Sequence, residues 1–520
     1  MTNNDIVQKL WNLCDVLRDD GINYSDYVTE LVMLLFIKMV HENTEAGVLK
    51  KHPLPEGCRW TDLNRLSGIT LLDSYKRILL SLSSGKDAEG NRVHDDPLIS
   101  AIYADAQTRL REPRHLEQII KRFDEIQDWF SATKDGLGDL YEGLLEKNAN
   151  ETKSGAGQYF TPRGLINSMV RCVQPKIGEV IQDPAAGTAG FLVAADQYLR
   201  EQTDDYDDLS DKDHQFQINK AFVGIELVPN TRRLALMNCL LHGMEGDDEG
   251  VVHLGNALGD AGKALPAADV ILANPPFGTS KGGEASNTRD DLTFKTSNKQ
   301  LAFLQHIYRN LKPGGRAAVV LPDNVLFEAG VGTEVRRDLM NKCNLHTILR
   351  LPTGIFYAQG VKTNVLFFTK GTTENPRQEE DCTQNVWVYD LRTNMPSFGK
   401  RTPFTEEYLK PFETVYHADT REEGDYAFNA EQIDVDKDAV EENQNIDDRL
   451  AHSRWRSFSR EWIAETKGDS LDISWLRDKE SVDAASLPAP EVLAKEAKDE
   501  LSAAMSDLEA LLGALEGEQG

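Results

Sequence analysis

Residues 180–192, with the sequence VIQDPAAGTAGFL, decide the fold of this 520-residue chain. A short aliphatic run is followed by a turn of small residues and then by an apolar stretch that opens a helix. Small residues in such a turn allow the backbone to approach a ligand closely. Only Gly187 and Gly190 are glycines, so the strict GxGxxG spacing of a dinucleotide fold is missing, and the turn alone is weak evidence for a cofactor site.

The sequence around this segment alternates short apolar runs with helical stretches from about residue 165 to 370. Strands separated by helices predict a mostly parallel α/β sheet that is covered on both faces. One intervening helix, predicted over 301–311, is followed by Lys-Pro-Gly-Gly, a stop signal. Seven runs are predicted as strands: 180–182, 221–227, 251–254, 269–273, 316–321, 346–351 and 364–369.

Polar residues stand at the ends of the first three predicted strands. Asp183 follows the first strand, and Glu226 lies at the end of the second, where an acidic side chain suits a ribose diol. Asn256 follows the third strand in the sequence GNAL and could contact an adenine edge. A simple turn residue is the other interpretation of Asn256.

The fourth predicted strand ends in the tetrapeptide NPPF, residues 274–277. Two prolines fix φ twice and remove two donors, so the amide oxygen of Asn274 and a proline carbonyl are held as neighbouring acceptors. Both can accept from one planar NH2 group, which leaves the nitrogen lone pair pointing at an electrophilic carbon. Phe277 offers a flat face for a heterocycle, an interaction worth about 1–3 kcal/mol per base.

A further candidate segment, GQYFTPR, lies upstream at residues 157–163. Its two aromatics, hydroxyl and Arg163 could clamp a small ligand before a helix begins. Taken alone, such a segment is more often a helix start with Thr161 as the N-cap.

As an ordered set, GQYFTPR, DPAAGTAGFL, GIEL, GNAL and NPPF resemble the amino-group DNA methyltransferases whose cofactor motifs precede the catalytic one. This likeness covers roughly residues 150–370. Together with the helical N-terminal part, NPPFGTS and an acidic C-terminal part, nearly the whole chain resembles the modification (M) subunit of a type I restriction-modification system. The resemblance implies an α/β fold: a Rossmann-like methyltransferase domain with a seven-stranded, mostly parallel sheet, a helical N-terminal domain and a C-terminal helical extension.

The resemblance also implies residue roles. Asp183 would lie near the amino-acid moiety of S-adenosylmethionine, Glu226 on its ribose and Asn256 near its adenine. Asn274, Pro275, Pro276 and Phe277 would grip a flipped adenine, which is methylated at N6 by direct in-line transfer from the sulfonium, with no covalent intermediate and no metal. The implied cofactor contacts are Gln158, Tyr159, Phe160, Thr161, Pro162, Arg163, Asp183, Gly187, Thr188, Ala189, Gly190, Glu226 and Asn256.

Two positions depart from the family pattern. Many relatives have Cys where this chain has Ala186, and Asp where it has Asn256. Neither departure removes the acceptors of the NPPF motif. The second removes a charge at the expected adenine contact.

The implied function is a site-specific DNA adenine-N6 methyltransferase subunit that protects host DNA from restriction. A base inside a duplex cannot reach such a site, so flipping is required. The net charge of −28 excludes a uniformly basic nucleic-acid binder, so another chain must supply most of the duplex binding. In the family a specificity (S) subunit reads the sequence, a restriction (R) subunit can join, and two M copies accompany each S subunit.

Three alternatives remain at this point. Cytosine N4 or a glutamine amide could be the methyl acceptor, although Phe277 in place of Tyr and the motif order favour adenine. A non-catalytic scaffold for a DNA complex is a second possibility, against which the intact NPPF argues. A nicotinamide-dependent enzyme is the third, against which the missing GxGxxG argues.

The rest of the chain suggests the domain plan and compartment. The longest apolar run, LVMLLFI at 31–37, is far below the roughly 20 residues of a membrane span, so no membrane association is expected. Six scattered cysteines without CxxC indicate neither disulfides nor zinc, and a reducing cytoplasm is expected.

Residues 371–520 carry 16 Lys and Arg against 35 Asp and Glu, and 386–390 is a candidate for one more strand. The apolar stripe from 491 onward predicts a helix that is buried either on the chain's own fold or on a partner helix. The resemblance makes this helix the candidate for docking on the specificity subunit. The predicted domains are a helical domain (1–150), the catalytic domain (151–370), an acidic irregular extension (371–487) and the docking helix (488–520).

Overall fold

The computed structural model describes residues 3–23, 26–47, 49, 51–126, 137–151, 161–278, 289–356, 361–399, 402–418 and 453–477. The predicted C-terminal helix and the predicted cofactor contacts Gln158, Tyr159 and Phe160 lie outside these ranges.

The N-terminal part of the chain is helical, as its periodicity predicts. Helix α3 lies inside this group and buries even Lys38, whose ammonium pairs with Asp124 at 2.8 Å and with Glu42 at 2.7 Å. The helices are α1 (Asn3–Trp11), α2 (Cys14–Asp19), α3 (Tyr27–Glu45), α4 (Trp60–Leu63), α5 (Gly68–Ser84), α6 (Pro97–Ile102), α7 (Pro113–Asp124) and α8 (Leu137–Glu151).

The rest of the described chain is built on one sheet with the strand order β3-β2-β1-β4-β5-β7-β6-β8-β9. The pairs from β3 to β5 are parallel, whereas β7 runs antiparallel to both β5 and β6. The strands are β1 (Ile181–Asp183), β2 (Phe222–Glu226), β3 (Val252–Leu254), β4 (Ala268–Ala273), β5 (Leu311–Pro322), β6 (Cys343–Arg350), β7 (Thr363–Lys370), β8 (Asn385–Asp390) and β9 (Trp455–Ser459).

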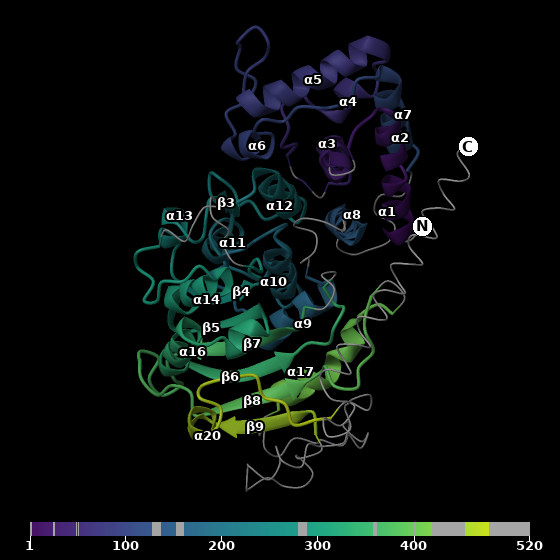
Figure 1. Ribbon diagram of the computed structural model, residues 1–520. Helices are drawn as coiled ribbons and strands as arrows, with labels where there is room; N and C mark the ends of the chain where they lie inside the picture. The colour runs from purple at the N-terminus through teal and green to yellow at the C-terminus, as the bar shows by residue number, and fades with distance from the viewer. Residues whose placement is uncertain are drawn as a thin grey trace, which may run out of the picture.

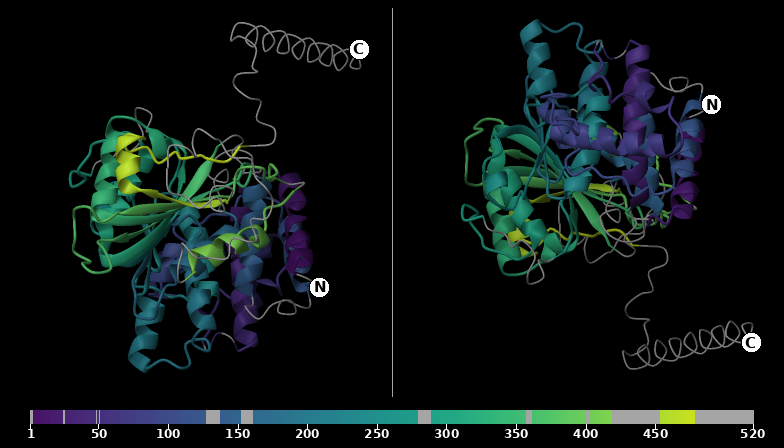
Figure 2. Two further views of the ribbon diagram at one scale, coloured as in Figure 1. Left: turned by 90° about the horizontal axis from the view of Figure 1, so that it is seen from below. Right: turned by 90° about the horizontal axis from the view of Figure 1, so that it is seen from above.

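Helices cover both faces of this sheet. Successive strand residues point to opposite faces, so a continuous apolar strand places side chains in the core on each side. On β4, Val270 and Leu272 belong to one core cluster, while Ile271 and Ala273 belong to another. The first cluster meets α9 (Arg163–Val173), α10 (Gly190–Glu201), α12 (Pro229–Leu241) and α17 (Lys410–Tyr416); the second meets α14 (Lys299–Asn310) and α16 (Val331–Lys342). Figure 2, which views the molecule from below and from above, shows this layering.

The sheet has nine strands where seven were expected. Strand β8 confirms the candidate at 386–390 and lies parallel to β6; β9 pairs antiparallel with β8 at the end of the sheet. Both come from the segment 371–487 that was expected to be irregular. The short α20 (Arg460–Glu465) follows β9 directly, and Figure 1 places this pair beyond β8.

The helical N-terminal part packs on the sheet-containing part through α12. The guanidinium of Arg233 on α12 is buried; its Nε donates to the carbonyl of Ile102 at 2.8 Å, and its Nη2 donates to the carbonyl of Ala104. Apolar residues of α1 to α8 belong to the same core cluster as those of α9, α10 and α12. The two parts therefore share one continuous core, with the helices above the sheet in Figure 1.

Candidate active site

Strand order brings the predicted site residues at the strand ends to one edge of the sheet. Strand β1 lies between β2 and β4, with Asp183 opposite Gly224 and Gln182 opposite Ile271. These strands are parallel, so their carboxyl ends meet at the same edge, where open α/β sheets bind their ligands. Asp183, Glu226 and Asn274 thus end three adjacent strands although the sequence separates them.

The turn after β1 has the left-handed backbone that its small residues permit. Gly187 has φ of +54° and Ala189, just before α10, has φ of +67°. The amide of Gly187 donates to Glu226 Oε2 at 3.0 Å, and the amide of Val228 donates to Oε1 at 2.8 Å. These two bonds hold the carboxylate beside the turn. A carboxylate has about four lone-pair sites, so each oxygen keeps acceptor capacity for a ribose hydroxyl.

The buried carboxyl group of Asp183 and the half-buried one of Glu226 make the charge state of this edge depend on its ligand. Burial raises the pKa of Asp183 to about 8, which the nearby Glu226 carboxylate also favours, while a bond from the Ala185 amide opposes the rise. Burial likewise raises the pKa of Glu226, against the amides of Val228 and Gly187. A positively charged ligand would offset the cost of ionising either group. Such an edge suits a cationic ligand.

Asn256 forms hydrogen bonds within the turn after β3. Its Oδ1 accepts from the Leu258 amide at 2.9 Å, and its carbonyl accepts from Gly259 at 3.0 Å and from Gly262 at 3.2 Å. The structure thus gives Asn256 the turn role that was one of its two interpretations. Its amide nitrogen is the group with which this side chain could donate to an adenine.

The NPPF motif and the segment before α9 meet at a hydrogen bond. Asn274 Nδ2 donates to Thr161 Oγ1 at 2.9 Å, and Thr161 is buried. This bond determines which way the amide is turned and therefore where its acceptor oxygen lies. Thr161 does not cap α9, whose N-cap is Pro162 without a side-chain bond, because its hydroxyl serves Asn274 instead.

Arg163 connects three helices. Its Nη1 lies 2.7 Å from Glu142 Oε2 on α8, and its Nη2 donates to Gln197 Oε1 on α10 at 2.5 Å. Asn238 on α12 joins the same group by donating to Glu142 Oε1 and to the carbonyl of Thr188. Arg163 therefore supports the turn that carries Thr188, Ala189 and Gly190.

Sequence reasoning missed two residues at this edge. Phe356, from the connection between β6 and β7, is buried, and its ring lies 6.3 Å from that of Phe277 at an interplanar angle of 68°. Leu227 follows Glu226 and is 56% exposed. A large apolar residue directly after the strand-end Glu226 was the sequence signal for Leu227, whereas only the fold brings Phe356 to Phe277.

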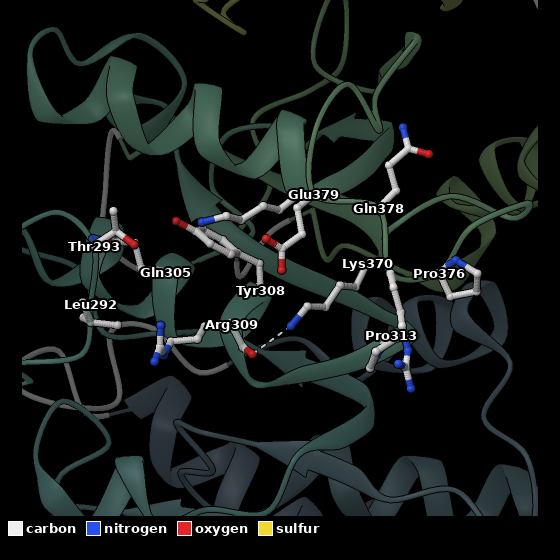
Figure 3. Close-up of a pocket in the computed structure, with 12 residues that line it drawn as sticks. Leu292, Thr293, Gln305, Tyr308, Arg309, Pro313, Lys370, Pro376, Gln378 and Glu379 are labelled. Carbon is white, nitrogen blue, oxygen red and sulfur yellow. Dashed lines mark hydrogen bonds between the residues drawn. The ribbon is translucent and has the colours of Figure 1, made fainter.

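A pocket of about 490 Å³ lies at the opposite edge of the sheet, near the start of β5 and the end of β7 (Figure 3). None of the predicted site residues lines it. It is lined by Leu292, Thr293, Gln305, Tyr308, Arg309, Pro313, Lys342, Lys370, Pro376, Arg377, Gln378 and Glu379.

Most of the cations in this pocket are already engaged. Lys370 Nζ donates to the carbonyls of Arg309 at 3.0 Å and Leu311 at 2.7 Å, which caps the end of α14. Arg309 pairs with Asp291 at 3.0 Å, and Lys342 lies 2.8 Å from a carboxylate of α16. The bonds of Lys370 join β7 to α14 and that of Lys342 lies within α16, so they serve the fold.

The site edge fits S-adenosylmethionine. Its left-handed turn of small residues, the bound Glu226 carboxylate and the buried Asp183 supply close backbone approach, ribose acceptors and a group for a positive charge. The described residues contain no group of three or more His, Cys, Asp or Glu side chains placed to hold a metal ion. Within the same residues, no helix has the length and apolarity that crossing a bilayer requires.

Fold and site together define a methyltransferase that acts on amino groups. Residues 132–458 match the family model N-6 DNA Methylase, and residues 6–123 match the HsdM N-terminal domain. The chain is 56% identical to the EcoKI methylase subunit of Escherichia coli K12 over 98% of its length and 95% of that protein. It is equally similar to the StySJI methylase subunit of Salmonella typhimurium.

Two solved structures to which this chain is similar also come from type I restriction-modification systems. The crystal structure of the EcoKI M protein has a TM-score of 0.60 at 52% identity and covers 98% of this chain and 96% of that chain. A type I restriction-modification structure concerned with complex assembly has a TM-score of 0.68 at 26% identity over the full length of both chains. This chain therefore belongs to the N-6 DNA methylase family, among the methylase subunits of type I restriction enzymes. It is an adenine-N6 DNA methyltransferase that uses S-adenosylmethionine as methyl donor.

Proposed function

We propose that methyl transfer takes place at the carboxyl edge formed by β1, β2 and β4. One observation carries this proposal: the hydrogen bond from Asn274 to Thr161, at 2.9 Å, joins the NPPF motif to the segment expected to clamp the cofactor. The donor and acceptor substrates would then meet where these two segments meet.

On the donor side, the chain's own groups bind and orient. Glu226 accepts from the ribose hydroxyls with the lone pairs that Gly187 and Val228 leave available. Asp183 faces the amino-acid part of the cofactor, and Leu227 supplies an apolar surface beside the adenine. The bound sulfonium supplies the electrophilic methyl group.

On the acceptor side, Asn274 Oδ1 and the Pro275 carbonyl accept from the N6 amino group of a flipped adenine. Thr161 keeps the Asn274 amide in the orientation that presents Oδ1 rather than Nδ2. Phe277 stacks on the base, and Phe356 supports Phe277 from the side. The amine proton passes to solvent after transfer.

The acidic chain works with partners. The net charge of −28 leaves duplex binding to a specificity subunit, with which two copies of this chain would assemble, and a restriction subunit would join them on DNA. Such a complex acts on host DNA in the cytoplasm, where the six free, buried cysteines remain reduced.

The first experiment is a calorimetric titration of the full chain with S-adenosylmethionine beside an Asp183→Ala/Glu226→Ala double variant. We expect binding by the wild type and loss of binding by the variant. Methyl transfer is then measured with the specificity partner present, by mass spectrometry of nucleosides, against Asn274→Ala. That variant should keep cofactor binding and lose about 100-fold or more of its activity.

Two results would contradict the proposal. Methylated cytosine instead of N6-methyladenine would show that the base is wrong. An Asn274→Ala variant with wild-type turnover would show that transfer occurs elsewhere. Binding only in the presence of the partner would mean that the partner completes the cofactor site.

A further inference from the structure

An exposed aromatic side chain, Phe327, lies near the NPPF motif. Strand β5 is parallel to β4, with Val319 opposite Ala273, so β5 reaches past the point where NPPF begins and leads into α15 (Asn324–Phe327). The first turn of α14 links the two segments, since the amide of Lys299 donates to the carbonyl of Gly278 at 3.4 Å and Asn298 Nδ2 donates to Glu328 Oε2 at 2.7 Å. The residues directly after NPPF and directly after Phe327 thus flank the same helix end.

Phe327 is 52% exposed although its neighbours Val325 and Leu326 are fully buried. The segment that carries it is firmly held. Arg336, itself buried on α16, donates from Nη1 to the carbonyls of Val325 at 3.1 Å and Glu328 at 2.8 Å. The amide of Leu471 donates to the carbonyl of Leu326 at 2.8 Å. A rigid support thus presents a large apolar ring to solvent beside the candidate active site.

An exposed aromatic ring beside the active site could contact DNA bases during base flipping. Extruding an adenine costs a few kcal/mol of lost stacking and pairing, and DNA-binding proteins offset such costs by placing apolar side chains against the unstacked bases. The flipped base enters at NPPF, so the duplex must lie against this edge, where Phe327 protrudes. We propose that Phe327 contacts the bases flanking the target adenine and supports the stack when that adenine leaves. This inference rests on the proposed function, because it requires a flipped base at NPPF.

The test uses the full chain in complex with its specificity subunit and two duplexes. One has 2-aminopurine at the target position and reports flipping by fluorescence; the other has adenine there and is the methyl acceptor, because 2-aminopurine lacks the N6 amino group. The methylated site is first located by sequencing host DNA. Phe327→Ala should lower the fluorescence increase on binding several-fold and lower kcat/KM for DNA about tenfold, with unchanged affinity for S-adenosylmethionine. Phe327→Tyr should stay within about threefold of the wild type, since it keeps the ring. Leu80→Ala, at a 55% exposed position on α5, is the matched control and should behave as the wild type.

A weakened target pair separates flipping from a structural role. With an abasic site opposite the target adenine, extrusion costs less, so Phe327→Ala should regain activity to within about threefold of the wild type. The inference is overturned if Phe327→Ala flips and methylates normally, or if its defect persists on the abasic duplex. Loss of the subunit complex in the variant, seen by light scattering, would also overturn it and assign Phe327 to a protein interface. Failure of the wild type to methylate would instead contradict the proposed function.

Discussion

The hydrogen bond between Asn274 and Thr161 is the residue-scale feature on which the proposed chemistry depends. Thr161→Val keeps the volume but removes the acceptor, so the Asn274 amide loses the contact that orients it. A hydrogen bond of this kind is worth about 1 kcal/mol and more when a buried donor is left without a partner, so we expect methyl transfer to fall about tenfold. Single-turnover kinetics of the assembled complex would measure this.

Thr161→Ser is the matched control, because it keeps the hydroxyl and should retain most of the activity. The affinity for S-adenosylmethionine tells the two possible roles of Thr161 apart. If Thr161→Val weakened cofactor binding and left the rate at saturating cofactor intact, Thr161 would serve the cofactor rather than Asn274.

The raised pKa of Asp183 predicts that cofactor binding depends on pH. Its pKa of about 8 lies above the ordinary value of 3.8, so without ligand the carboxyl is mostly protonated at pH 6.5. A cationic ligand favours the carboxylate, so binding releases a proton, and affinity should rise up to about tenfold per pH unit until pH 8 and then level off. Calorimetry in buffers of different ionisation enthalpy would measure the released proton.

Asp183→Asn should make this part of the pH profile flat. Over the same pH range in which cofactor affinity rises, the free energy of unfolding of the unliganded wild-type chain should fall. A raised folded-state pKa contributes stability that is fully present below pH 3.8 and is lost as pH rises through about 8. An affinity that falls between pH 6.5 and 8 would contradict the role assigned to Asp183.

At the scale of elements, β8 is held to the sheet by a buried ion pair. Arg350 Nη1 on β6 lies 3.4 Å from Asp390 Oδ2 on β8, and Asp390 also accepts from the amides of Arg392 and Thr393, each at 2.8 Å. Asp390→Ala would leave a buried guanidinium without its buried carboxylate and with only the half-exposed Asp472 nearby, so we expect a loss of about 3 kcal/mol. The unfolding midpoint in urea, followed by the fluorescence of the stacked Trp387 and Trp455 beside it, would report this loss.

Asp472→Ala provides the comparison. Asp472 also lies near Arg350, at 3.8 Å, but its side chain is 41% exposed, so its removal should cost less than about 1 kcal/mol. Equal effects of the two variants would show that burial of Asp390 is not what makes the pair important.

The strands also show which elements sequence patterns can predict. The seven strands predicted between 180 and 369 are confirmed within about five residues, because strands buried on both faces are largely continuous apolar runs. Strand β9 was missed: the run WRSFS is short, contains the buried Arg456 and follows an acidic stretch. Its strand state comes from pairing with β8 and from the Trp387–Trp455 stack, which are contacts between distant segments.

At the scale of the whole molecule, the predicted docking helix can be separated from the catalytic edge. Residues 491–520 lie outside the described part of the chain, and their apolar stripe is the reason to expect a partner helix. Deleting them should abolish the complex with the specificity subunit while cofactor affinity stays unchanged. Multi-angle light scattering of the mixed subunits would measure the first effect, and a complex that persists would contradict the docking role.

The sequence by itself determined the helical N-terminal part, the strand and helix order of the catalytic part and which polar residues stand at the strand ends. These follow from local periodicity and from motifs that are contiguous in the chain. Only the tertiary structure decided that Thr161 binds Asn274 instead of capping a helix, that Arg163 joins α8, α9 and α10, and that Phe356 lies against Phe277. The physical reason is that parallel strand order brings distant carboxyl ends to one edge, so the partners of a side chain there come from segments that no local pattern connects.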